Sequence, residues 1–174
     1  MNDNHQSFAK RIFEVSNIRG EFRLRSGRIS EEYFDKYLFE TNPVLLQEIA
    51  QGLSQLVPPN VDALAGLEMG GIPIATLLSQ ITGIPALFVR KTPKEYGTCK
   101  FVEGGEVENR KLVIVEDIVT SGGQIIMSAN ALRESGAEIV RVLCVIDREE
   151  GGKENLAAEG LDLHSLFTMQ DLKA

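Results

Sequence analysis

The stretch VIVEDIVTSGGQ, residues Val113–Gln124, decides the fold of this chain. It begins within a strand predicted over 111–115, and strands that are apolar on both faces are typical of parallel sheets. Glu116 and Asp117 follow, and a segment rich in Thr, Ser and Gly then leads into a helix predicted over 123–135. Because ligands of parallel sheets bind beyond the carboxyl ends of the strands, we expect a binding site here.

The same alternation of strand and helix extends on both sides of this stretch. The predicted elements nearest to it are strands over 61–67, 85–89, 139–146 and 163–167 and helices over 74–82 and 153–159. The N-terminal part is expected to hold helices over 4–16 and 43–56 and short strands over 21–25 and 34–39. The pattern predicts an α/β fold, a mostly parallel central sheet flanked by helices, formed by residues 1–174 as one domain.

The residues after the central strand have the chemistry of a sugar-phosphate site. The carboxylates of Glu116 and Asp117 are suited to accept hydrogen bonds from adjacent ribose hydroxyls and to help hold a hydrated Mg²⁺. Backbone N–H groups of Thr120–Gly123, at the start of a helix, are suited to bind phosphate. A simpler alternative is that Asp117 or Ser121 only caps the helix. The G-K-[ST] of a Walker A loop is missing, and Val119 stands where a nucleophile elbow has Gly.

Composition limits the class of partner. Of the 174 residues 43% are hydrophobic and 25% charged, and the formal net charge is −7. This charge disfavours nucleic-acid binding, which depends on an excess of Lys and Arg. No apolar run approaches the roughly 20 residues of a membrane span, and the polar N-terminus lacks the apolar core of a signal peptide. We therefore expect a cytoplasmic protein that binds neither nucleic acid nor membrane.

The two cysteines and two histidines do not form a metal-binding pattern. Cys144 lies in an apolar run and is expected to be a small buried hydrophobe. Cys99 lies in a polar loop and is expected to be a free thiol in a reducing compartment.

The string VIVEDIVTSGG resembles the phosphoribosyl diphosphate signature of type I phosphoribosyltransferases. The resemblance implies that family's fold, with a small N-terminal hood formed mainly by residues 18–40. It also implies Mg²⁺ as cofactor, held mainly through pyrophosphate and water rather than directly by protein side chains. Glu116 and Asp117 then hold the ribose diol, and the rest of this substrate site is Ile118, Val119, Thr120, Ser121, Gly122, Gly123 and Gln124.

A basic loop, RKTPKEYGTCKFVEGG, occupies residues 90–105, directly after the strand predicted over 85–89. Long loops in compact domains often act as lids, and cations suit a pyrophosphate leaving group, although a solvated charged loop is the simpler alternative. The loop resembles the mobile catalytic loop of orotate phosphoribosyltransferases. There an Arg and two Lys contact pyrophosphate, often in the neighbouring subunit of a dimer. These positions match Arg90, Lys91 and Lys94, and Tyr96 stands where that family often has His.

The N-terminal segment resembles the hood of the same family, in which an aromatic pair packs on the base. Tyr33 and Phe34 match that pair, and ordinary core packing is the alternative role for them. The family has a Lys before Ser-Gly that contacts the phosphoribosyl group. Arg25 takes that position here, which keeps the charge but changes the geometry.

A second segment, DREEGG at 147–152, resembles the D-R-x-x-G-G of the family. The family's arginine binds the carboxylate of orotate, and this position is Arg148. Thr120 is expected to contact orotate as well. Without the resemblance, a surface ion pair of Arg148 with Glu149 or Glu150 is the simpler interpretation. One turn departs from the family: Gly70 stands where many relatives carry a Lys before G-I-P, so one cation is missing.

The resemblance implies an orotate phosphoribosyltransferase. Such an enzyme transfers phosphoribosyl from 5-phosphoribosyl 1-diphosphate to orotate, giving orotidine 5'-monophosphate and pyrophosphate in pyrimidine biosynthesis. Lys94, Glu116 and Asp117 are the residues expected to be catalytic, in a homodimer that shares the loop across subunits. Two alternatives remain: an enzyme of the same fold that uses another base, and a non-catalytic regulator that senses phosphoribosyl diphosphate.

Overall fold

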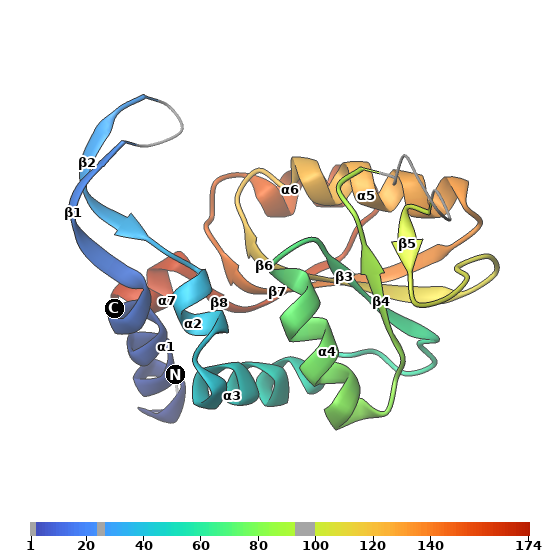
Figure 1. Ribbon diagram of the computed structural model, residues 1–174, viewed down its shortest axis with the longest axis horizontal. Helices are drawn as coiled ribbons and strands as arrows, with labels where there is room; N and C mark the ends of the chain where they lie inside the picture. The colour runs from blue at the N-terminus through green and yellow to red at the C-terminus, as the bar shows by residue number, and fades with distance from the viewer. Residues whose placement is uncertain (1–2, 24–26, 93–99) are drawn as a thin grey trace.

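A six-stranded sheet forms the centre of the molecule (Figure 1). The structure is a computed structural model and describes residues 3–23, 27–92 and 100–174. Along the sheet the strands are β5 (Val102–Glu103), β4 (Ala86–Val89), β3 (Ala63–Leu67), β6 (Lys111–Val119), β7 (Glu138–Asp147) and β8 (Leu163–Thr168). Every neighbouring pair is parallel except β4–β5. The predicted mostly parallel sheet is therefore confirmed.

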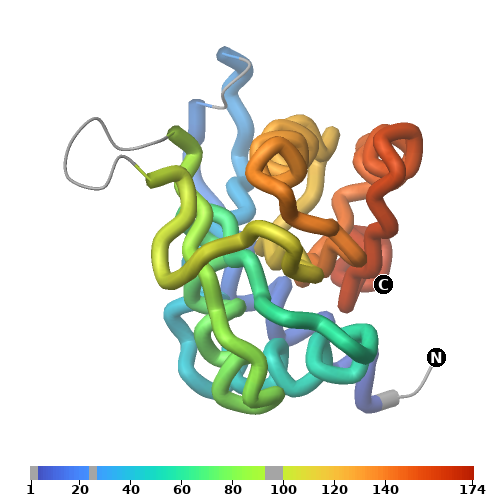
Figure 2. The backbone as a smooth tube through the Cα atoms, turned by 90° about the vertical axis from the view of Figure 1, so that its right-hand side faces the viewer, coloured from blue at the N-terminus to red at the C-terminus, as the bar shows by residue number. Residues whose placement is uncertain are grey.

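Helices cover both faces of this sheet. Helices α5 (Gly123–Glu134) and α6 (Gly152–Ala158) lie on one face, and α3 (Pro43–Ser54) and α4 (Gly71–Thr82) lie on the other. Figure 2 shows the sheet between these two layers. The central strand β6 sends Leu112 and Ile114 to the first layer and Val113 and Val115 to the second, and all four are 0% exposed. Burial on both faces explains the unbroken apolar run.

The hood stands apart from the main sheet (Figure 1). It is an antiparallel pair of strands, β1 (Asn17–Arg23) and β2 (Ile29–Phe34), followed by the short helix α2 (Tyr37–Glu40). The prediction of a strand over 34–39 was wrong, because β2 ends at Phe34. Asp35 then turns the chain, its Oδ1 accepting a hydrogen bond from the backbone N–H of Tyr37 at 3.1 Å.

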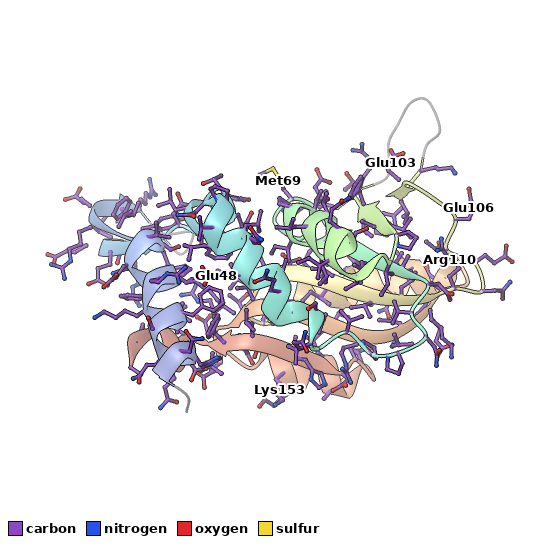
Figure 3. All side chains as sticks on the ribbon, turned by 90° about the horizontal axis from the view of Figure 1, so that it is seen from below. Glu48, Met69, Glu103, Glu106, Arg110 and Lys153 are labelled. Carbon is purple, nitrogen blue, oxygen red and sulfur yellow. The ribbon has the colours of Figure 1, made fainter. Side chains whose placement is uncertain are left out.

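Two terminal helices pack against each other beside the main sheet. Helix α1 (Asp3–Ser16) leads into β1, and α7 (Met169–Lys173) follows β8. Arg11 of α1 pairs with Glu48 of α3 at 2.6 Å, and the Phe8 ring packs edge-on against Phe167 of β8. Glu48 is labelled in Figure 3. These contacts seat α1 on the same sheet face as α3. No helix in the described ranges is long and apolar enough to cross a membrane.

The other predicted elements lie within a few residues of the observed ones, with one consequential difference. Strand β6 continues to Val119 rather than ending at 115, because β7 pairs with it as far as Asp147. Glu116 and Asp117 therefore lie inside the strand and have its fixed geometry. Helix α2, strand β5 and helix α7 were not predicted, and they are only four, two and five residues long.

Candidate active site

A cavity of about 350 Å³ opens at the carboxyl ends of β3 and β6. Its walls come from the start of α2, from the turn between β3 and α4, and from the end of β6 with the loop into α5. Outside the stretch 116–125, the residues that line it are Lys36, Tyr37, Glu68, Met69 and Lys91. The structure thus brings the predicted residues Glu116 to Gln124 and Lys91 to one site, at the edge of the sheet where a ligand was expected.

The two carboxylates of the motif are buried and differ in their partners. Glu116 is 9% exposed and accepts a hydrogen bond from the backbone N–H of Asp117 at 3.1 Å. Asp117 is 1% exposed, and its Oδ1 accepts from the Ile118 N–H at 2.5 Å while Oδ2 accepts from Lys36 Nζ at 2.5 Å. Burial, and then the nearby Asp117 carboxylate, raise the pKa of Glu116 well above its ordinary value.

Lys36 and Glu40 are site residues that the sequence did not reveal as such. Glu40 is 6% exposed, and its Oε1 has no hydrogen-bond partner among the described atoms. Burial, and then the Asp117 carboxylate, raise the pKa of Glu40 to about 8. No local signal marked them, because their partner Asp117 is far away along the chain and only folding brings these residues together.

The segment between β6 and α5 has the backbone of an anion site. Gly122 lies at φ +77°, a left-handed conformation that favours glycine, and it precedes the first turn of α5. No side chain caps this helix, so the alternative that Asp117 or Ser121 caps it was wrong. Asn155 of α6 braces the segment by donating from Nδ2 to the Ser121 carbonyl at 3.0 Å. The N–H groups of the first helical turn therefore face the cavity with the positive end of the helix dipole.

A second cavity, of about 840 Å³, lies between the hood and the main body. It brings together the residues expected to bind the base, Tyr33, Phe34, Thr120 and Arg148. Thr120 lines both cavities, so the two sites adjoin. Arg148 also forms the ion pair that the simpler interpretation predicted, with its Nε 3.1 Å from Oε1 of Glu150.

The two aromatic residues of the hood, Tyr33 and Phe34, differ in how they pack and in how far they are exposed. The Phe34 ring lies 6.3 Å from the Phe13 ring, so packing against the body accounts for part of its role. Tyr33 is 45% exposed and lies 5.5 Å from the Phe22 ring within the hood. Tyr33 thus presents a ring to the second cavity.

The basic loop is described only at its two ends. Lys91 lines the first cavity, and its backbone N–H donates to Glu68 Oε2 at 3.0 Å. Arg90 instead pairs with Glu103, with 3.2 Å between Nε and Oε1, and is not among the described residues that line the cavity. Lys94, Tyr96, Cys99 and the hood residue Arg25 lie outside the described residues. Cys144 is fully buried in β7, as expected.

Comparison with known proteins places this site in a family. The model of the phosphoribosyl transferase domain matches residues 39–161. An orotate phosphoribosyltransferase of Nocardioides is 47% identical over 168 residues, which cover 97% of this chain and 94% of that protein.

The chain belongs to the orotate phosphoribosyltransferase family.

Solved structures agree with this family and its type I phosphoribosyltransferase fold. An orotate phosphoribosyltransferase of Mycobacterium tuberculosis, crystallised with Fe(III) dicitrate, superposes with a TM-score of 0.88 at 29% identity. The match covers 98% of this chain and 99% of that one. The same M. tuberculosis enzyme in complex with 5-phospho-alpha-D-ribosyl 1-diphosphate gives a TM-score of 0.83 at 28% identity.

Proposed function

We propose that this orotate phosphoribosyltransferase family member transfers phosphoribosyl from 5-phosphoribosyl 1-diphosphate to N1 of orotate. The products are orotidine 5'-monophosphate and pyrophosphate, in the biosynthesis of pyrimidine nucleotides. One observation carries the proposal: a cavity with paired acids and an uncapped helix N-terminus meets, at Thr120, a cavity that holds Arg148 and Tyr33. The first fits a sugar that carries a phosphate and a diphosphate, and the second fits a flat base with a carboxylate.

Different residues of the first cavity bind different parts of phosphoribosyl diphosphate. Thr120–Gly123 and the first turn of α5 bind the 5-phosphate through backbone N–H groups. Asp117 and Glu116 accept hydrogen bonds from the ribose hydroxyls. The bond between C1 of the ribose and the pyrophosphate oxygen breaks, and a bond between C1 and N1 of orotate forms. Lys91, with Lys94 and Arg90 from the loop, stabilises the charge that grows on the departing pyrophosphate.

The residues present fit a Mg²⁺ ion that arrives with the substrate. Within residues 3–23, 27–92 and 100–174, no group of three or more His, Cys, Asp or Glu side chains is placed to hold a metal ion. The carboxylates of Glu68, Glu116 and Asp117 do line the cavity, where they suit contacts to the water shell of such an ion. Mg²⁺ bound to the diphosphate would neutralise part of its negative charge.

Arg148 and Tyr33 select the base. A carboxylate on the base can replace Glu150 as the partner of the Arg148 guanidinium, and bidentate pairing with a carboxylate suits arginine. The exposed Tyr33 ring offers a flat surface on which a pyrimidine can stack. Purine bases carry no carboxylate for Arg148 to bind, which argues against the alternative of another base.

A panel of bases tests this assignment. Pyrophosphate release is measured with phosphoribosyl diphosphate, Mg²⁺ and either orotate, uracil, adenine or hypoxanthine, with Lys94→Ala as the control for turnover. We expect release with orotate alone, and much less of it in the variant. Release with a purine would favour another base. No release with any base, from folded protein, would favour the non-catalytic regulator.

Three further proposals concern the whole protein. We propose that residues 1–174 work as one domain, in which the hood, 18–40, closes the base cavity. We also propose a homodimer that shares the basic loop across subunits, and a cytoplasmic location.

A further inference from the structure

The first cavity is lined by several carboxyl groups, so an anionic ligand needs cations close to them. Its lining includes Glu68, Glu116 and Asp117, and the buried Glu40 is close to Asp117. Among the described residues that line the cavity, the cations are Lys36 and Lys91. Lys91 stands where the basic loop begins, so Lys36 is the positive charge that faces the acids from the hood side.

Lys36 is held in this position by contacts on two sides. It lies between β2 and α2 with its side chain 32% exposed, and its Nζ donates to Asp117 Oδ2 at 2.5 Å. The same ammonium group lies 5.2 Å from the centre of the Tyr37 ring. Burial lowers the pKa of Lys36, but the hydrogen bond to Asp117 and the nearby carboxylates outweigh this and raise it, so the ammonium stays charged.

The surroundings of Gly70 explain why the cation comes from the hood side of the cavity and not from the turn before α4. A Cβ atom at Gly70 would lie 1.5 Å from Asp117 Oδ2 and 2.8 Å from Glu40 Oε1. No side chain fits there while Asp117 pairs with Lys36. A lysine in the turn before α4, which the family resemblance leads one to expect at position 70, is therefore incompatible with this arrangement of the acids. Lys36 reaches the same carboxylate oxygen, Asp117 Oδ2, from the segment between β2 and α2.

We propose that Lys36 binds the pyrophosphate group of phosphoribosyl diphosphate, as the cation that the turn at Gly70 lacks. The inference rests on the proposed function and names a further substrate-binding residue. An ammonium group has three N–H donors, of which Asp117 uses one, so the others remain to bind phosphate oxygens. Asp117 keeps Lys36 aimed into the cavity before the substrate arrives, which reduces the entropy lost on binding.

Binding measurements with the two halves of phosphoribosyl diphosphate, pyrophosphate and ribose 5-phosphate, test this role of Lys36. Isothermal titration calorimetry gives the dissociation constants of Mg²⁺-pyrophosphate and of ribose 5-phosphate for the wild type, Lys36→Met and Lys36→Arg. Lys10→Met removes the same charge from the exposed surface of α1 and is the matched control. We expect Lys36→Met to weaken pyrophosphate roughly tenfold and ribose 5-phosphate less than twofold. Lys36→Arg should retain most of the pyrophosphate affinity, and Lys10→Met should change neither constant.

Repeating the measurements in an Asp117→Asn variant distinguishes a direct contact between Lys36 and pyrophosphate from an indirect effect of Lys36 through Asp117. In Asp117→Asn, Lys36 no longer neutralises a carboxylate at that position, and removing it leaves no stranded charge there. If Lys36 contacts pyrophosphate, Lys36→Met still weakens pyrophosphate binding in this background. This double variant also keeps the test informative if Lys36→Met alone does not fold.

Two results would overturn the proposal: equal weakening of both ligands by Lys36→Met, or no effect of Lys36→Met on pyrophosphate in the Asp117→Asn background. Because these are binding measurements, they stand apart from turnover. A wild type that binds pyrophosphate through Lys36 but does not use orotate would contradict the proposed function and leave this inference intact.

Discussion

Glu40 is a buried acid whose ionisation opposes folding. Its pKa is about 8 in the folded protein and 4.5 as an ordinary glutamate, so the folded state binds more protons between these values. The free energy of unfolding should therefore fall as the pH rises from 4.5 to 8, by at most about 1.4 kcal/mol per pH unit. Glu40→Gln should flatten this slope and be more stable than the wild type at pH 8. Urea denaturation at several pH values measures it.

The exposed Glu134 provides the control for this experiment. Glu134→Gln removes the same charge from the surface of α5 and should leave the wild-type slope unchanged. An identical pH dependence in Glu40→Gln and the wild type would mean that Glu40 is ionised in the folded protein, contrary to its burial.

Substitutions of Arg148 and Glu150 are expected to change KM for orotate in opposite directions. Arg148→Met removes the proposed partner of the orotate carboxylate and should raise KM for orotate about tenfold to a hundredfold, with a small effect on KM for phosphoribosyl diphosphate. Glu150→Gln removes a competitor for Arg148, and exposed pairs contribute at most about 1 kcal/mol. It should lower KM for orotate by up to about fivefold. Steady-state kinetics with each substrate varied in turn would contradict this if the two variants shifted KM in the same direction.

The sequence was sufficient for residues whose role is encoded locally. Glu116, Asp117 and Thr120 stand close together in one motif, so their spacing alone predicts a shared site. Lys36 could not be predicted in this way, because its partner Asp117 lies 81 residues away and only folding brings them together. Side chains that act across such a separation leave no local pattern in a single sequence.

The junction of β6 and α5 tests the anion site at the level of an element. Gly123→Ala adds a methyl group that meets only Ser121 Oγ, at 3.9 Å, at a helical position where Ala is favoured over Gly. This variant should fold as stably as the wild type, yet bind ribose 5-phosphate about tenfold more weakly, because the methyl group lies where the phosphate approaches. Thermal unfolding and calorimetry measure the two effects.

Gly122 provides the contrast at the neighbouring position. Its φ of +77° and a Cβ contact of 3.0 Å with Leu156 Cγ predict that Gly122→Ala loses about 1–2 kcal/mol of stability. If Gly123→Ala were destabilised as much as Gly122→Ala, or bound ribose 5-phosphate normally, the anion site would not lie at this helix terminus.

Helices and strands could be predicted from the sequence where the hydrophobic pattern extended over many residues. The twelve residues of α5 and the ten of β7 gave clear patterns, but the apolar residues near Tyr37 did not distinguish a strand from the four-residue helix α2. The end of β6 was placed too early because charged residues rarely occupy a buried strand. Glu116 and Asp117 lie there because that position serves the site.

At the scale of the whole molecule, the proposed homodimer predicts complementation. If the loop of one subunit serves the cavity of the other, Lys94→Ala and Asp117→Asn variants are each inactive alone but form one intact site per mixed dimer. Unfolding and refolding an equal mixture should restore about a quarter of the wild-type rate, since half of the dimers are mixed and each has one of two sites. Sedimentation velocity checks the assembly, and a mixture that stays inactive while dimers form would contradict the sharing of the loop.

The most direct measurement of the central claim is the conversion of orotate itself. Purified protein is given orotate, phosphoribosyl diphosphate and Mg²⁺, and orotidine 5'-monophosphate and pyrophosphate are quantified over time. We predict equal amounts of the two products, formation that requires both substrates, and a large loss of rate in Lys94→Ala. Folded protein that binds phosphoribosyl diphosphate but forms no orotidine 5'-monophosphate would contradict the assignment.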